Sequence, residues 1–98
     1  MWVGGVRPTM QIAQLCRKHG FKFTPHSWSN GLGFIVNAHI MAAFGFAQDL
    51  PYEYPLSPPG WTIEARDALL TEPWQHEKVW RNMPQRPGLG FDIITKRW

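Results

Sequence analysis

The amino-acid sequence predicts an α/β fold in which the strands of a parallel sheet are joined by helical crossovers. Segments typical of strands and helices alternate in the order strand, helix, strand, helix, strand, helix, and a strand-rich tail follows. The chain has 98 residues, of which 44% are hydrophobic and 17% are charged, so it is one globular domain at most, or a piece of one.

The first helix is predicted between a glycine turn and Gly20. "MWVGG" is typical of a strand that ends in a turn, and Pro8 suits the first helical position because the N–H that it lacks has no partner there. Arg17 and Lys18 complement the negative end of the helix dipole, and Gly20 is a typical stop.

A short strand and a long apolar helix are predicted next. "FKFT" places Phe21 and Phe23 on one face of a strand, and Pro25 then opens the loop "HSWSNGLG". Leu32–Phe44 is apolar almost all round, which predicts a helix buried on most sides. Because the chain also carries six Trp and six Phe, we expect some of the groups that cover this helix to lie outside these residues.

The remaining elements are shorter. "PYEYP" predicts a very short strand, and Thr62 is a suitable N-cap for a helix through Leu70, with Glu64 near the positive end of its dipole. "KVWRNM" and "FDII" have the composition of strands and form the predicted strand-rich tail.

Two side chains at consecutive strand ends form the candidate site. His26 follows one predicted strand and Glu53 lies in the next, and reactive groups gather at the carboxyl ends of parallel strands. An imidazole titrates near neutral pH and can transfer protons, and a glutamate between Tyr52 and Tyr54 can act as a proton donor. The alternatives are a histidine that falls in a turn and an exposed glutamate at a strand end.

Other motifs favour structural roles. Asn30–Gly33 opens a helix and can hold an anion, but a tight turn that needs glycine explains it better. Cys16 and His19 have metal-ligand spacing without a second ligand pair, so a zinc site is not expected. His39 lies among apolar residues, where a histidine bonded to the backbone is the better interpretation, and no Ser/His/Asp triad can be defined.

Charge and hydropathy bear on the partners. The net charge is +3, but the ten Lys and Arg are scattered, so no nucleic-acid partner is expected. The longest apolar stretch is too short to span a bilayer and the N-terminus lacks the apolar core of a signal peptide, so we expect no membrane partner. The single Cys16 cannot form an intrachain disulfide, which fits a cytoplasmic location.

Three stretches together resemble one family. "GGVRPTMQIAQLCRKHGFKFTPHSWSNGLG", "YEYPLSPPGW" and "RPGLGFDI" follow one another as in the C-terminal end of mandelate racemase-type enzymes of the enolase superfamily. The resemblance covers nearly the whole chain. It implies the last two strand–helix units of a (β/α) TIM-type barrel at residues 1–71, and a tail at 72–98 that packs on a capping domain outside the chain.

The resemblance also implies a chemistry. The family uses Mg²⁺ and removes the proton next to a carboxylate in racemases, epimerases, cycloisomerases and acid-sugar dehydratases, so it implies a small carboxylate or acid-sugar substrate. His26 matches the family's general base or acid, and Glu53 matches a glutamate that hydrogen-bonds the developing oxyanion. The family's metal ligands lie on strands that this chain does not contain. We therefore expect a fragment of a lyase or isomerase that is inactive alone.

A second hypothesis is a small non-catalytic binding module. The apolar Leu32–Phe44 helix would then mediate self-association into a homo-oligomer. Sedimentation and thermal melting distinguish the two hypotheses, because a module should melt sharply as an oligomer, and a fragment should be molten or aggregate.

Overall fold

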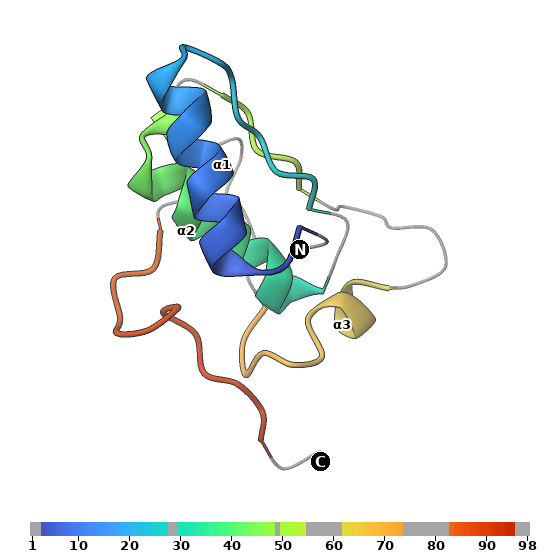
Figure 1. Ribbon diagram of the computed structural model, residues 1–98. Coiled ribbons are helices and arrows are strands. Elements are labelled where there is room, and N and C mark those ends of the chain that lie inside the picture. The colour runs from blue at the N-terminus through green and yellow to red at the C-terminus, as the bar shows by residue number, and fades with distance from the viewer. Residues whose placement is uncertain (1–2, 28–29, 49, 55–61, 74–82, 96–98) are drawn as a thin grey trace.

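The computed structural model describes residues 3–27, 30–48, 50–54, 62–73 and 83–95. Within these residues the elements are α1 (Val6–Lys18), α2 (Gly31–Ala43), the 3₁₀ turn η1 (Phe46–Gln48) and the short helix α3 (Ile63–Arg66). In Figure 1, α1 and α2 lie against each other, and the extended segments 21–27 and 50–54 run along one side of the pair.

Helix α1 confirms the first predicted helix but begins two residues earlier than expected. Gly4 and Gly5 have φ angles of 102° and 103°, a region that favours glycine, and they turn the chain into the helix at Val6. Pro8 therefore lies inside the first turn, where a missing N–H still costs nothing. Arg17 and Lys18 occupy the last turn, as predicted.

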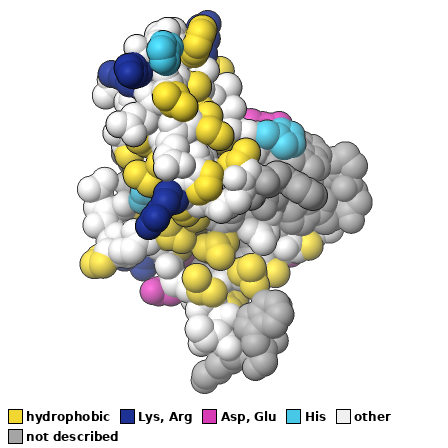
Figure 2. Space-filling model, viewed as in Figure 1, with side chains coloured by type: hydrophobic (Ala, Val, Ile, Leu, Met, Phe, Trp, Pro, Cys, Tyr) yellow, Lys and Arg dark blue, Asp and Glu magenta, His cyan; other side chains and the backbone are white. Residues whose placement is uncertain are grey.

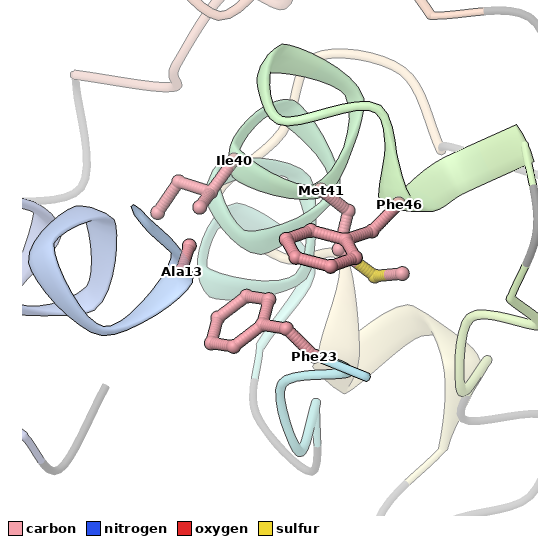
Figure 3. Packing of buried hydrophobic residues seen from close by; sticks show 5 residues of the cluster. All are labelled: Ala13, Phe23, Ile40, Met41 and Phe46. Carbon is pink, nitrogen blue, oxygen red and sulfur yellow. The ribbon is translucent and has the colours of Figure 1, made fainter. Parts of the chain in front are cut away.

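Helix α2 is buried on most sides, as predicted, but the chain itself covers it. Asn30 caps the helix by accepting a hydrogen bond from the Gly33 N–H at 2.9 Å. One cluster of buried residues joins α2 to the rest of the chain, as Figure 3 shows, and consists of Ala13, Phe23, Ile40, Met41 and Phe46. A second cluster consists of Phe34, Ile35, Ala38 and Leu70.

This burial bears on two expectations about α2. The cover for much of this helix comes from within these residues rather than from outside them, because segments before and after it fold back onto it. Seven of its residues are buried, and self-association through the rest of its surface stays a prediction. Exposed apolar side chains lie instead on α1, and Figure 2 shows hydrophobic side chains on that part of the surface; they are Val6, Met10, Ile12 and Leu15.

The expected parallel strands are not formed within the described part of the chain. Segments 21–27 and 51–54 are extended but make no strand pairing. Pro25 and Pro51 have no N–H to donate to a ladder, and the contacts between the two segments involve side chains. The predicted strand–helix order therefore appears as helices joined by extended segments.

Helix α3 begins as predicted and ends early. The Thr62 side chain accepts a hydrogen bond from the Ala65 N–H, but the helix stops at Arg66 rather than continuing to Leu70. Leu70 instead forms an antiparallel bridge with Ile93 of the tail.

The tail packs on the same core as the helices. Its apolar side chains contact the second cluster, and they are Met83, Leu89 and Phe91. Arg86 forms an ion pair with Glu72, within the segment after residue 71. Most of "KVWRNM" lies outside the described residues, and the bridge at Ile93 is the strand-like pairing found in the described part of "FDII". The boundary at residue 72 and the capping domain stay predictions. No helix among the described residues is both long and apolar enough to cross a bilayer.

Candidate active site

The two predicted site residues lie in contact. His26 ends the extended segment that follows α1, and Glu53 lies in the extended segment that follows η1. His26 Nδ1 and Glu53 Oε2 are 3.0 Å apart, and the two side chains are 71% and 40% exposed. The structure therefore brings the imidazole and the carboxyl to one accessible position on the surface.

The contact determines which nitrogen of a neutral His26 ring carries the proton. A carboxylate accepts hydrogen bonds and donates none, so a neutral His26 ring carries its proton on Nδ1 and donates it to Glu53. The lone pair is then on Nε2, which is the nitrogen that can take a proton from another molecule. Glu53 also stabilises the imidazolium that such a transfer produces, because the two charges are opposite.

Ser27 connects the pair to the interior. Its N–H donates to Glu53 Oε2 at 2.8 Å, so one carboxylate oxygen accepts from both the His26 ring and the next residue's amide. The Ser27 hydroxyl donates to the Tyr52 hydroxyl oxygen at 2.6 Å and lies 3.2 Å from the Pro25 carbonyl oxygen. Ser27 is fully buried, which fixes both contacts in place.

Tyr52 anchors this end of the site to α2. Its hydroxyl donates to the Phe34 carbonyl oxygen at 2.7 Å, and its ring stacks on the Phe34 ring at 4.7 Å between centroids. Burial raises the pKa of Tyr52 well above its ordinary value, because a phenolate would lose its hydration there. The hydroxyl of Ser27 lowers that pKa and the Glu53 carboxylate raises it, and the net direction is upward.

Asn37 approaches the same point from the next turn of α2. Its Nδ2 donates to the His26 carbonyl oxygen at 3.5 Å, and its amide lies beside the Tyr52 hydroxyl, where it lowers the pKa of that phenol. Asn37 Oδ1 is buried and has no hydrogen-bond partner among the described residues. Ser27, Asn37 and Tyr52 therefore form a buried polar cluster beneath the exposed pair.

A second buried polar contact lies beyond Tyr54. Arg66 and Asp67 form an ion pair with Nη2 and Oδ2 2.6 Å apart, and both side chains are buried. The hydrogen bond to Asp67 raises the pKa of Arg66, and the guanidinium lies over the Tyr54 ring at 4.9 Å. This pair holds α3 against the segment that carries Glu53.

The described residues do not fit a magnesium site. Magnesium prefers several oxygen ligands, usually carboxylates. Among residues 3–27, 30–48, 50–54, 62–73 and 83–95, no group of three or more His, Cys, Asp or Glu side chains could hold a metal ion. No metal-dependent step is therefore assigned to these side chains.

The other motifs have structural roles. His39 Nε2 lies 2.9 Å from the Leu89 carbonyl oxygen, which confirms a histidine bonded to the backbone. His19 is the C-cap of α1, and Cys16 packs against the first cluster. Gly31 is needed for close packing rather than for a turn, since a Cβ there would lie 2.5 Å from Asp67 Oδ1.

The buried polar cluster was not among the predicted site residues. The sequence offers no triad to which Ser27 could belong, and Asn37 lies inside the apolar Leu32–Phe44 run. The available signals were a polar residue inside that run and a tyrosine next to the glutamate. Neither signal predicts which residue the side chain contacts, because the contacts join residues that are far apart in the sequence.

The comparisons with known proteins agree with one another. The family model described as enolase C-terminal domain-like matches residues 1–97. The chain is 30% identical over 94 residues to arabinonate dehydratase of Saccharolobus solfataricus, a match that covers 95% of this chain and 23% of that protein. The chain thus spans less than a quarter of the length of this relative. No solved structure matches.

Proposed function

The chain belongs to the enolase C-terminal domain-like family, and from this membership we propose that it is part of an enzyme that removes the proton next to a carboxylate. The substrate class is a small acid, and the preferred reaction is dehydration of an acid sugar, because the curated relative is named a dehydratase. Racemisation and epimerisation share the first step and are the alternative outcomes.

His26 is the proposed acid–base residue. The observation that carries this proposal is the 3.0 Å contact between Nδ1 and Glu53 Oε2, which leaves Nε2 as the basic nitrogen of an exposed ring. Glu53 Oε2 accepts from two protein donors, and this geometry favours a role in orienting His26. The oxyanion role expected for Glu53 stays a prediction.

Members of the enolase superfamily generally use Mg²⁺, which stabilises the charge that develops when the proton leaves. The described residues do not form a ligand set for it. We propose that the ligands belong to other parts of a longer protein, as the 23% coverage of the relative supports. The 98-residue chain alone should then be inactive.

The test is deuterium exchange at the α-carbon of aldonic acids in D₂O containing Mg²⁺. The full-length protein that carries these residues should exchange the α-proton, and the 98-residue chain should not. His26→Asn in the full-length protein should lower the exchange rate by about 10²–10⁴-fold, the usual contribution of a general acid or base.

The matched control is His19→Asn, which changes an exposed histidine at the end of α1. It should leave exchange within about twofold of the wild type, because substitutions away from the site have small effects. The proposal is wrong if full-length His26→Asn exchanges the α-proton at the wild-type rate.

A further inference from the structure

We propose that Asn30 is a site of spontaneous deamidation, and that the isoaspartate formed there removes the cap of α2. The sequence has Asn30 directly before Gly31, and this pair has no part in the proposed function. The inference therefore stands whether or not His26 transfers a proton.

The reacting groups are adjacent in the chain and open to water. Asn30 is exposed and precedes the first residue of α2. Gly31 has no side chain to hinder the approach of its backbone nitrogen to Asn30 Cγ. The first N–H groups of a helix also have no acceptor inside that helix, so no helical hydrogen bond holds the Gly31 nitrogen.

The reaction needs water and no other reactant, and asparagine is among the thermally labile side chains. The Gly31 nitrogen gives its proton to hydroxide and forms a bond to Asn30 Cγ. The bond from Cγ to Nδ2 then breaks, and Nδ2 takes a proton from water and leaves as ammonia. The product is a succinimide ring. Water opens this ring at Cγ, which gives an aspartate, or at the main-chain carbonyl carbon, which gives an isoaspartate.

The cap of α2 controls how often this reaction starts. Asn30 Oδ1 accepts from the Gly33 N–H at 2.9 Å, so in the capped state the side-chain amide is held by Gly33 and is not free to reach the Gly31 nitrogen. The stabilisation usual for such a cap favours the capped state about 2- to 30-fold. The reaction therefore proceeds from the uncapped minority, about 2- to 30-fold more slowly than in an unfolded chain.

The two products differ in their effect on α2. An aspartate caps a helix as well as an asparagine does, and its charge would lie at the positive end of a helix that has no acidic residue in its first turn. An isoaspartate adds a carbon to the main chain and moves its carboxylate away from the Gly33 N–H, so the cap is lost. Because Phe34 and Asn37 of α2 contact the segments of the candidate site, the loss also affects that site.

The experiment incubates the 98-residue chain in warm, mildly alkaline buffer, both folded and unfolded in guanidinium chloride. Peptide mass spectrometry measures the mass gain of amide-to-acid conversion, which in the folded chain should localise to Asn30 and proceed about 2- to 30-fold more slowly than in the unfolded chain. Asn37 is the internal control, since it is buried within α2 and precedes Ala38. Asn30→Ser is the matched variant, because serine caps a helix but cannot form the ring, and it should show no gain at this position.

The same samples decide the proposal. Less than half conversion of Asn30 in the folded chain after about thirty half-lives of the unfolded chain overturns it. Conversion of Asn37 as fast as that of Asn30 also overturns it, because the reaction would then not be selective.

The effect on α2 is measured after chromatographic separation of the products. The isoaspartyl form should have a lower urea midpoint than the unmodified chain, whereas Asn30→Asp should have a midpoint at or above that of the unmodified chain. Equal midpoints for the isoaspartyl form and the unmodified chain overturn the proposed loss of the cap.

Discussion

At the scale of single residues, the site depends on one oxygen atom. Glu53 Oε2 accepts from the His26 ring and from the Ser27 amide, and hydrogen bonds to a charged acceptor are stronger than those between neutral groups. The same oxygen thus fixes both the ring and the backbone beside it. Removing the charge of Glu53 should therefore weaken the His26–Glu53 contact more than removing a charge elsewhere on the surface.

Glu53→Gln tests this dependence on charge. The amide keeps the shape of the side chain but accepts a weaker hydrogen bond from His26 Nδ1, so α-proton exchange by the full-length protein should fall about tenfold. Glu64→Gln makes the same chemical change at an exposed position of α3 and should leave the rate unchanged. Equal rates for Glu53→Gln and the wild type would contradict the orienting role.

Tyr52 predicts a loss of stability at alkaline pH. Its pKa is raised above the ordinary value of 10.0, so in the alkaline range the folded state holds a proton that the unfolded state releases. Its contribution to the free energy of unfolding is complete below pH 10.0 and declines as the pH rises above that value. Thermal midpoints recorded on both sides of this pH should show the decline, and Tyr52→Phe should reduce its slope. An unchanged slope would show that another group causes it.

The sequence predicts His26 and Glu53 as site residues but does not predict the buried polar cluster beneath them. Strand-end placement predicted that the two side chains would meet, and they do, although no strand pairing joins their segments. Ser27 and Asn37 contact residues that are distant in the sequence, and a single sequence does not show which distant residues meet in the fold. Their local patterns fit a turn and a helix interior equally well.

At the scale of elements, α2 serves the site as well as the core. Its apolar side chains fill both buried clusters, and its Phe34 carbonyl and Asn37 side chain contact the segments that carry Glu53 and His26. A helix buried on most sides usually excludes polar groups, so Asn37, whose Oδ1 has no partner in the described part of the chain, lowers the stability of the fold.

Asn37→Leu should therefore raise the stability of the protein and lower its activity. An unsatisfied buried acceptor costs about 1–3 kcal/mol, whereas the variant loses a long bond of 3.5 Å and the contact with the Tyr52 hydroxyl, so the free energy of unfolding should rise by at most about 1 kcal/mol. The full-length variant should exchange the α-proton more slowly, because the His26 carbonyl loses its donor. Urea unfolding and the exchange assay measure the two effects. A variant that is less stable than the wild type would show that the amide stabilises the fold.

The start of α2 depends on the absence of a side chain at Gly31. A Cβ there would lie 2.5 Å from Asp67 Oδ1 and 2.9 Å from Leu70 Cδ1. Asp67 cannot move freely because Arg66 holds it, so Gly31→Ala should lower the free energy of unfolding by about 1–3 kcal/mol. Ala42→Ser, at an exposed position of the same helix, should change it by less than about 0.5 kcal/mol. Equal urea midpoints for Gly31→Ala and the wild type would contradict the close packing.

Helices were easier to predict here than strands, for a physical reason. The caps and periodicity of α1 and α2 are local, and so is the Thr62 cap of α3. Leu70, where this helix was predicted to end, pairs instead with Ile93, and a parallel strand likewise depends on a distant neighbour to pair with. Pattern alone identified extended segments at 21–24 and 51–54 but could not show whether each one finds such a neighbour.

At the scale of the whole molecule, the tail and the helices share one core. Leu89 contacts the second cluster with its side chain, and its carbonyl oxygen accepts a hydrogen bond from His39 Nε2. The Thr71 N–H donates to the Asp92 carbonyl oxygen at 3.0 Å. These contacts join the tail to α2 and to the segment that follows α3. We therefore predict that the tail and the helices unfold as one cooperative unit, and the packing of the tail on a capping domain stays a prediction as well.

Leu89→Ala tests whether that unit is cooperative. The side chain is partly buried against the second cluster, so its truncation should cost about 1–2 kcal/mol, less than for a fully buried leucine. If the tail and helices unfold together, the urea midpoint of the helical circular dichroism should fall, although the substitution lies outside every helix. Ile93→Thr, at a side chain that is 44% exposed, should leave that midpoint nearly unchanged. A helical transition unaffected by Leu89→Ala would mean that the tail is energetically separate, as the boundary predicted at residue 72 requires.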